Sequence, residues 1–144
     1  MSRRAAREAA LQALFQIDLG KVDLADAVQF VTEENNLNEE QNKFVTELVS
    51  GVLHNISGIN NIIKDISIDW NLERMAAADR NILRLALFEM CFSEGVPGNV
   101  AVNEAIELGK TFSTAESGKF INGILGKIMD NLDKYKVIKS NAGV

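Results

Sequence analysis

The sequence predicts an all-α protein on three observations. Apolar residues recur at intervals of three and four along most of the chain, which places them on one face of a helix. Only one proline occurs in 144 residues, and this scarcity favours helices because proline removes a helical hydrogen bond. No useful stretch alternates apolar and polar residues as a half-buried strand does. The length fits one domain, or two subdomains sharing a core.

Four helices are predicted in the first half of the chain. The first runs from a cap at Ser2 to a stop at Gly20 and buries a face rich in alanine, the strongest helix former. Asp23 is placed to cap the second helix, and Asn38 to open the third. The fourth begins at Ser57.

The pattern is interrupted at residues 69–72, which we interpret as a subdomain boundary. A single domain over residues 1–144 would then consist of an N-terminal helical part, about 1–68, and a C-terminal helical part, about 69–138.

Three further helices bring the predicted number to seven. Residues 82–92 are apolar on nearly every side, which is typical of a helix at the centre of a bundle. Asn99 is expected to cap the next helix after a Gly-Pro loop. The last helix should run from about Ser117 to Tyr135, with a capping box formed by Ser113 and Glu116.

The charge distribution indicates an anionic partner more clearly than the net charge of −5 does. Residues 1–22 carry four basic groups against two acids, and residues 110–144 carry six against three. The segment between them carries five basic groups against fifteen acids. If the two basic ends fold onto one face, that face can bind phosphate.

Nothing in the sequence favours catalysis, a metal site or a cofactor. His54 is the sole histidine, and Cys91 lies in the most apolar predicted helix, where we expect it to be core. Neighbouring acids such as Glu33 and Glu34 point about 100° apart on a helix and do not converge on a substrate. We also expect no membrane span and no secretory signal, and therefore a cytoplasmic protein.

Arg3, Arg4 and Arg7 form the first candidate binding surface. Their spacing of three and four lets them share a helix surface. Cations at a helix N-terminus oppose its dipole, whereas a phosphate there would gain from the arginines and the free N–H groups together. The alternative is a solubilising terminus that binds nothing.

The second candidate is the segment 110–123, which combines lysine, aromatic, hydroxyl and amide side chains. Single-stranded RNA is recognised by such groups, because aromatic rings stack on bases and lysines bind phosphate. Gly118, Gly123 and Gly126 weaken a helix unless another backbone approaches closely. The alternative is that Phe120 is core and the glycines allow tight helix packing.

A third candidate lies between Trp70 and Asp79. Trp70 is expected to anchor the linker to the second subdomain. Glu73 and Asp79 are expected to be exposed acids beside it, where a basic protein could dock or which could be plain surface.

Five segments occur in a fixed order over almost all of the sequence. They are Arg3–Phe15, Phe44–Val52, Ile82–Met90, Val96–Leu108 and Lys119–Leu125. Because of these segments, taken in this order, the chain as a whole resembles the NusB family.

The resemblance implies two small helical bundles side by side and a function in transcription antitermination. It implies binding of boxA RNA jointly with NusE, the tenth protein of the small ribosomal subunit, in the RNA polymerase complex that transcribes ribosomal RNA operons. Glu73 and Asp79 would contact NusE. The implied RNA-binding residues are Arg3, Arg4, Arg7, Phe15, Ser117, Lys119, Phe120 and Asn122.

The sequence departs from the family pattern at a few positions. Phe15 stands where a tyrosine is common, which removes a hydroxyl, and Gly109 and Gly118 replace residues with side chains. Two alternatives stay open: a helical module that binds only protein, including a homodimer, and a stand-alone relative of the RNA-binding domain of ribosomal RNA cytosine methyltransferases.

Overall fold

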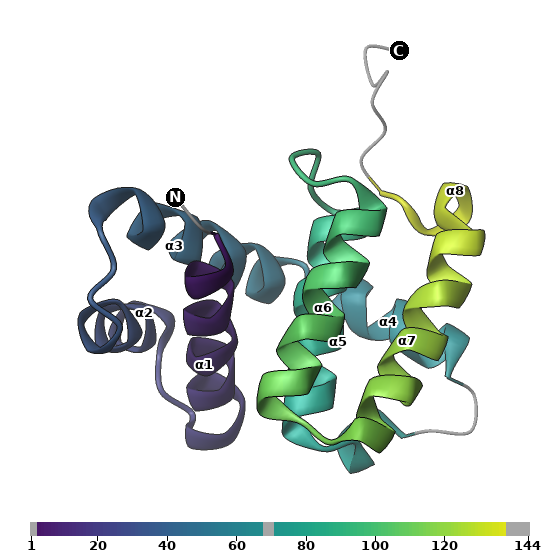
Figure 1. Ribbon diagram of the computed structural model, residues 1–144, viewed down its shortest axis with the longest axis horizontal. Helices are drawn as coiled ribbons and strands as arrows, with labels where there is room; N and C mark the ends of the chain where they lie inside the picture. The colour runs from purple at the N-terminus through teal and green to yellow at the C-terminus, as the bar shows by residue number, and fades with distance from the viewer. Residues whose placement is uncertain (1–2, 68–70, 138–144) are drawn as a thin grey trace.

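The computed structural model describes residues 3–67 and 71–137, and within these ranges the protein is entirely helical (Figure 1). No strand occurs in the described residues, which confirms the predicted fold class. None of the helices in this part of the chain is long and apolar enough to cross a membrane. The elements are α1 (Arg4–Gly20), α2 (Leu24–Glu34), α3 (Glu39–His54), α4 (Ile56–Ile66), the 3₁₀ turn η1 (Leu72–Arg74), α5 (Ala77–Cys91), α6 (Gly98–Phe112), α7 (Ala115–Asp130) and α8 (Leu132–Tyr135).

The helices form two groups that share α5 as their common neighbour. Helices α1, α2 and α3 pack against one another on the left of Figure 1, and α4, α6 and α7 gather around α5 on the right. Both α1 and α3 also contact α5, so one core runs through both groups. Helix α4 packs mainly on α5 and α7, although it precedes the boundary predicted at 69–72. That boundary stays a prediction, because residues 68–70, Trp70 among them, lie outside the described residues.

The core explains why α5 is so apolar. Leu83 and Leu87 of α5 are fully buried, and α1 contributes alanines, including Ala6 and Ala10, whose small side chains permit close packing. Cys91 is also fully buried, as predicted, and burial raises the pKa of its thiol to about 11.

The second and third helices start as the sequence predicts, whereas α4 begins at Ile56, one residue before the predicted Ser57. The Asp23 carboxylate accepts a hydrogen bond from the backbone N–H of Asp26 at 2.9 Å. Asn38 and Gln41 form a reciprocal capping box at the start of α3. Helix α1 ends at Gly20 as expected, with Lys21 in the left-handed region at φ 57°. The proposed cap at Ser2 lies outside the described residues.

The second half differs from expectation at its helix ends. Asn99 does not cap α6, because the helix already begins at Gly98 and Pro97 holds the capping position. Helix α7 begins at Ala115, where the Thr114 hydroxyl accepts the backbone N–H of Ser117. The expected box of Ser113 and Glu116 does not form.

The last predicted helix is divided at Asn131 into α7 and the single turn α8. The described residues therefore hold seven longer helices, as predicted, and one additional short turn.

Candidate nucleic-acid interface

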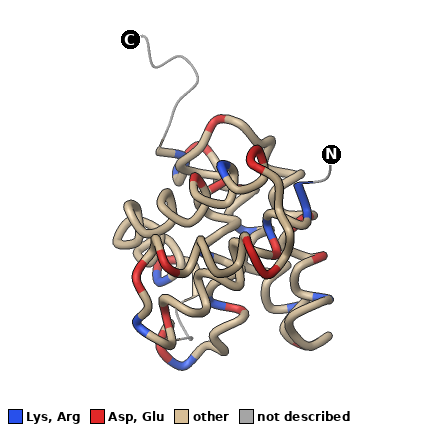
Figure 2. Tube along the Cα trace, turned by 90° about the vertical axis from the view of Figure 1, so that its left-hand side faces the viewer, with Lys and Arg blue, Asp and Glu red and all other residues tan. Residues whose placement is uncertain are grey.

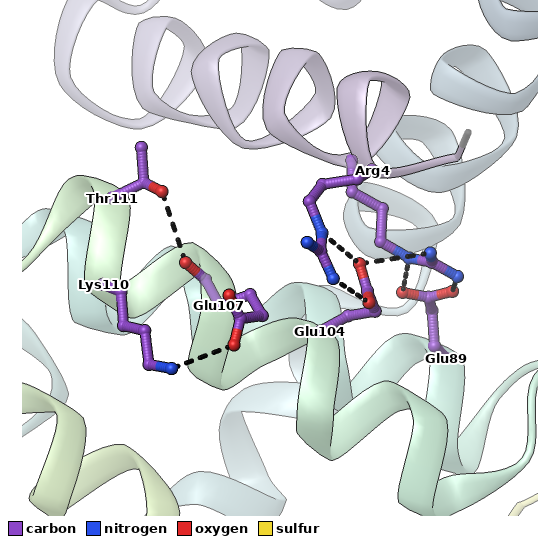
Figure 3. Close-up of polar contacts among 7 residues, drawn as sticks. Arg4, Glu89, Glu104, Glu107, Lys110 and Thr111 are labelled. Atoms are coloured by element: carbon purple, nitrogen blue, oxygen red, sulfur yellow. Dashed lines mark hydrogen bonds and ion pairs between the residues drawn. The ribbon is translucent and has the colours of Figure 1, made fainter.

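The two basic segments border the same helix, α6. Figure 1 shows α1, α6 and α7 side by side toward the viewer, with α6 in the middle. The start of α1 is joined to α6 by Arg4, whose Nε and Nη2 donate to the Glu104 carboxylate at 3.3 and 2.9 Å (Figure 3). Helix α7 packs along the other side of α6. The arginines of α1 and the start of α7 thus do not lie on opposite sides of the molecule.

The three arginines do not form one exposed cluster, which corrects the sequence-based expectation for Arg7. The Arg7 side chain is only 7% exposed. Its Nε and Nη2 donate to the two carboxylate oxygens of Glu89 at 3.0 and 2.9 Å. Arg7 is drawn inward because Glu89, itself buried in α5, requires a cation as partner. Arg7 therefore fastens α1 to α5 beneath the surface.

Arg3 and Arg4 are the arginines of this segment that reach solvent. The Arg3 guanidinium lies over the Phe44 ring, 4.3 Å from its centre, in a cation–π contact with α3. The Arg4 side chain is half exposed although it is paired with Glu104. Both charges sit where the α1 dipole disfavours cations, so an arriving anion would be stabilised by the helix end as well.

The two acids of α6 are paired with neighbouring bases. The hydrogen bond from Arg4 lowers the pKa of Glu104, which keeps the carboxylate charged. One turn further along α6, Glu107 accepts a hydrogen bond from Lys110 at 3.0 Å. Figure 2 shows basic and acidic positions interspersed along the trace rather than separated into two poles. An anion approaching α6 is therefore repelled less than it would be by unpaired carboxylates, because a cation lies beside each of the two acids.

A cleft of about 470 Å³ lies between α6 and α7, at the second candidate segment. Its lining includes Lys110, Ser113, Gly118, Lys119 and Asn122. Lys119 and Asn122 are exposed and provide a cation and an amide at the rim. The cleft thus brings together three of the side-chain types expected for RNA contact: lysine, hydroxyl and amide.

The two phenylalanines of the predicted site are half-buried. Phe15 and Phe120 both pack against the hydrophobic core, so part of each ring serves the fold. Ser117 is also half-buried, and its hydroxyl lies 3.1 Å from that of its capping partner Thr114.

The glycines of α7 are not explained by packing within the described protein. A Cβ atom added to Gly118, Gly123 or Gly126 would meet nothing within 4 Å. By contrast, a Cβ on Gly51 of α3 would overlap the Phe88 ring. Tight helix packing therefore accounts for Gly51 but not for the three α7 glycines. At these three positions no side chain projects from α7, and the space beside the backbone is empty.

The two acids expected on the partner surface have different environments. Glu73 is exposed on η1, as expected. Asp79 is not an exposed acid: it is 6% exposed and accepts a hydrogen bond from the Ser113 hydroxyl at 2.5 Å. The expectation of an exposed Asp79 is wrong because the first turn of α5 packs under the end of α6, where Ser113 replaces water as its partner.

Sequence reasoning missed the acids that hold the basic residues in place. Neither Glu89 nor Glu104 was expected to pair with an arginine of α1, although both do. Asp18 was also missed, and it pairs with Arg80 at 2.7 Å and Arg84 at 3.5 Å. Burial opposes ionisation of Asp18, but hydrogen bonds from Asn81 and Arg80 outweigh it and lower the pKa of this carboxyl. These pairs join α1 to α5 at the end opposite to Arg4.

The described residues contain no group of three or more histidine, cysteine or acidic side chains placed to hold a metal ion. Their features are a basic helix start, paired acids on α6, and a cleft between α6 and α7 whose lining includes lysine, hydroxyl and amide groups. These features define an all-helical binding protein with a candidate surface for nucleic acid.

Comparison with known proteins identifies the family. Residues 4–130 match the model of the NusB family, and the chain belongs to this family. A relative from Pelotomaculum thermopropionicum, named transcription antitermination protein NusB, is 48% identical over 143 residues, 99% of each chain.

Solved structures agree with this assignment. T. maritima NusB has a TM-score of 0.84 at 32% identity, with 100% of this chain and 99% of that chain covered. A crystal structure of the antitermination factors NusB and NusE in complex with dsRNA contains a chain with a TM-score of 0.83 at 27% identity, over 90% of this chain and 96% of that one.

Proposed function

We propose that this protein is a transcription antitermination factor that binds RNA together with NusE. The observation that carries the proposal is that Arg4 is hydrogen-bonded to Glu104 of α6, the helix that also lines the polar-edged cleft with α7. The names of the relatives and the similar NusB–NusE–RNA complex support it. The activity is one of binding, not of catalysis, and its place is the cytoplasm, where bacterial transcription occurs.

The finer form of the proposal is that the RNA is a single-stranded boxA element of ribosomal RNA transcripts. Arg3 and Arg4 would bind phosphates at the start of α1, and Ser117, Lys119 and Asn122 would contact the strand at the cleft. Phe112, at the end of α6, lies eight positions after Glu104, which is beside Arg4, and eight helical steps span about 12 Å. A few nucleotides would cover that distance. Phe15 and Phe120 are half-buried, and the part of each ring that reaches solvent would provide a surface on which a base could stack.

Arg7 has a supporting role in this proposal. It is buried against Glu89, and it holds the first turn of α1 against α5 and α6. Because its guanidinium also lies 5.4 Å from the Phe44 ring centre, it supports the ring on which Arg3 rests. Loss of Arg7 would therefore weaken RNA binding through the position of its neighbours.

NusE is the proposed protein partner, with Glu73 in its interface as an exposed acid facing a basic ribosomal protein. Asp79 would act indirectly, since its hydrogen bond to Ser113 fixes the turn between α6 and α7. The complex would act on RNA polymerase. Self-association of the free protein is a separate question, which sedimentation velocity without RNA answers.

The experiment is a salt titration of binding to fluorescent boxA-like single-stranded RNA, with and without NusE. The Arg3→Gln/Arg4→Gln variant should bind more weakly, and its slope of log K against log salt should flatten by about 0.7 for each phosphate that is no longer bound. Lys64→Gln is the control, because it removes an exposed cation from α4, a helix outside the proposed RNA-binding surface. If the double variant has the same slope as the wild type and this control, Arg3 and Arg4 do not bind RNA.

A further inference from the structure

The contact between Arg4 and Glu104 has the geometry that phosphate would use. Nε and Nη2 of Arg4 donate to the two different oxygens of the carboxylate, at 3.3 and 2.9 Å. Such two-pronged pairing is the arrangement in which arginine binds either a carboxylate or a phosphate. Glu104 thus occupies the edge of the guanidinium, formed by Nε and Nη2, that a phosphate group would take.

Glu104 is not needed to neutralise the buried charge beneath it. Arg7 already has Glu89 as a partner through two hydrogen bonds, whereas its nearest approach to Glu104 is 3.7 Å. The pairing with Arg4 contributes little to folding either, because Arg4 is half exposed and water would solvate it equally well. The carboxylate stays charged, since the hydrogen bond from Arg4 lowers its pKa. Its main effect is therefore on what else can bind Arg4.

We propose that Glu104 is a built-in competitor for phosphate at Arg4, and that RNA engages this arginine by displacing the carboxylate. The inference rests on the proposed RNA-binding function. A small anion that reaches only the start of α1 must displace Glu104 unaided. An RNA already held at the α6–α7 cleft presents its next phosphates at a high local concentration and displaces the carboxylate more readily. Glu104 therefore selects for strands that contact both ends of the surface, by weakening the binding of other anions.

The test uses Glu104→Gln, Arg4→Gln and the double variant, with two probes. Inorganic tripolyphosphate, followed through the arginine Nε–H signals in NMR spectra, reports on Arg4 without depending on RNA recognition. We expect Glu104→Gln to bind tripolyphosphate about two- to five-fold more tightly at low salt. With single-stranded RNA, the same variant should also bind more tightly, with a smaller gain than for tripolyphosphate, and its salt slope should stay unchanged because Arg4 binds the same phosphate in both proteins. Both effects should disappear when Arg4 is also replaced.

Glu107→Gln is the matched control, because it removes the same charge from the same helix at a carboxylate that hydrogen-bonds Lys110 instead. Its effect should be the same whether or not Arg4 is present. The proposal is overturned if Glu104→Gln gains equally in the Arg4→Gln background, which would show a general charge effect. It is also overturned if Glu104→Gln weakens binding, since Glu104 would then orient Arg4 for its ligand. If no variant binds RNA, the proposed function fails, and the tripolyphosphate result still decides whether Glu104 competes at Arg4.

Discussion

Replacing the α7 glycines by alanine should make the protein more stable. No described glycine has a positive φ, so alanine can adopt the backbone conformation at these positions. At Gly123 and Gly126 the new methyl group would meet no atom within 4 Å. The gain from helix propensity and from the reduced freedom of the unfolded chain is then unopposed, at about 0.5–1 kcal/mol for each single variant. For a chain of this length the melting temperature should rise by about 1–4 °C.

The measurement is urea and thermal unfolding followed by circular dichroism, on single variants. Gly51→Ala is the matched control, because its methyl group would overlap the Phe88 ring and should destabilise the protein by about 1–3 kcal/mol. A lower unfolding midpoint for Gly123→Ala or Gly126→Ala would refute the reasoning that this side of α7 is open. RNA and NusE titrations on the same variants then test a second point. A stabilised variant that binds more weakly would show that a ligand backbone uses the space.

The remaining predictions concern buried groups. Arg7→Ala should lower the free energy of unfolding by about 3–5 kcal/mol, because it leaves the Glu89 carboxylate buried without its cation. Arg4→Ala should leave it nearly unchanged, because surface ion pairs contribute little to stability. Urea midpoints measure both, and equal losses would contradict the burial of Arg7. Cys91, with its pKa raised to about 11 by burial, should react with iodoacetamide far more slowly at pH 8 than the same chain in urea, and mass spectrometry measures this. Rapid labelling of the folded protein at pH 8 would show that Cys91 is accessible.

Local signals made the helices predictable. The caps at Asp23 and Asn38 act on backbone groups three residues away, so a short stretch of sequence contains both partners of each contact. The central position of α5 was predictable as well, because a helix that is apolar all round must be buried. The end of α6 was harder to predict, because the Ser113 side chain could form either of two hydrogen bonds. It could cap α7 or bind Asp79, which lies 34 residues away, and only the packing of α5 under α6 decides between them.

The placement of Arg7 required information that spacing alone does not contain. Arg3, Arg4 and Arg7 all lie near the helix start, yet their environments differ because α5 and α6 approach from one side. A signal was nevertheless present, since Glu89 is a single acid within an otherwise apolar stretch. A buried carboxylate must find a cation, and an arginine on the alanine-rich face of α1 was a suitable candidate. A search for unpaired charges among predicted core positions would have linked Arg7 to Glu89.

The same pairing explains why the start of α1 can hold three arginines against its own dipole. Glu89 neutralises Arg7, Glu104 neutralises Arg4, and the Phe44 ring supports Arg3. Uncharged residues would have fulfilled the structural role at lower electrostatic cost. Glu89 and the Phe44 ring, from two other helices, instead hold Arg7 and Arg3 in fixed positions, whereas in the proposed competition Glu104 leaves Arg4 when RNA binds. Fixing Arg3 in advance favours an anion that binds there, because the complex is spared the entropy loss of ordering a long side chain.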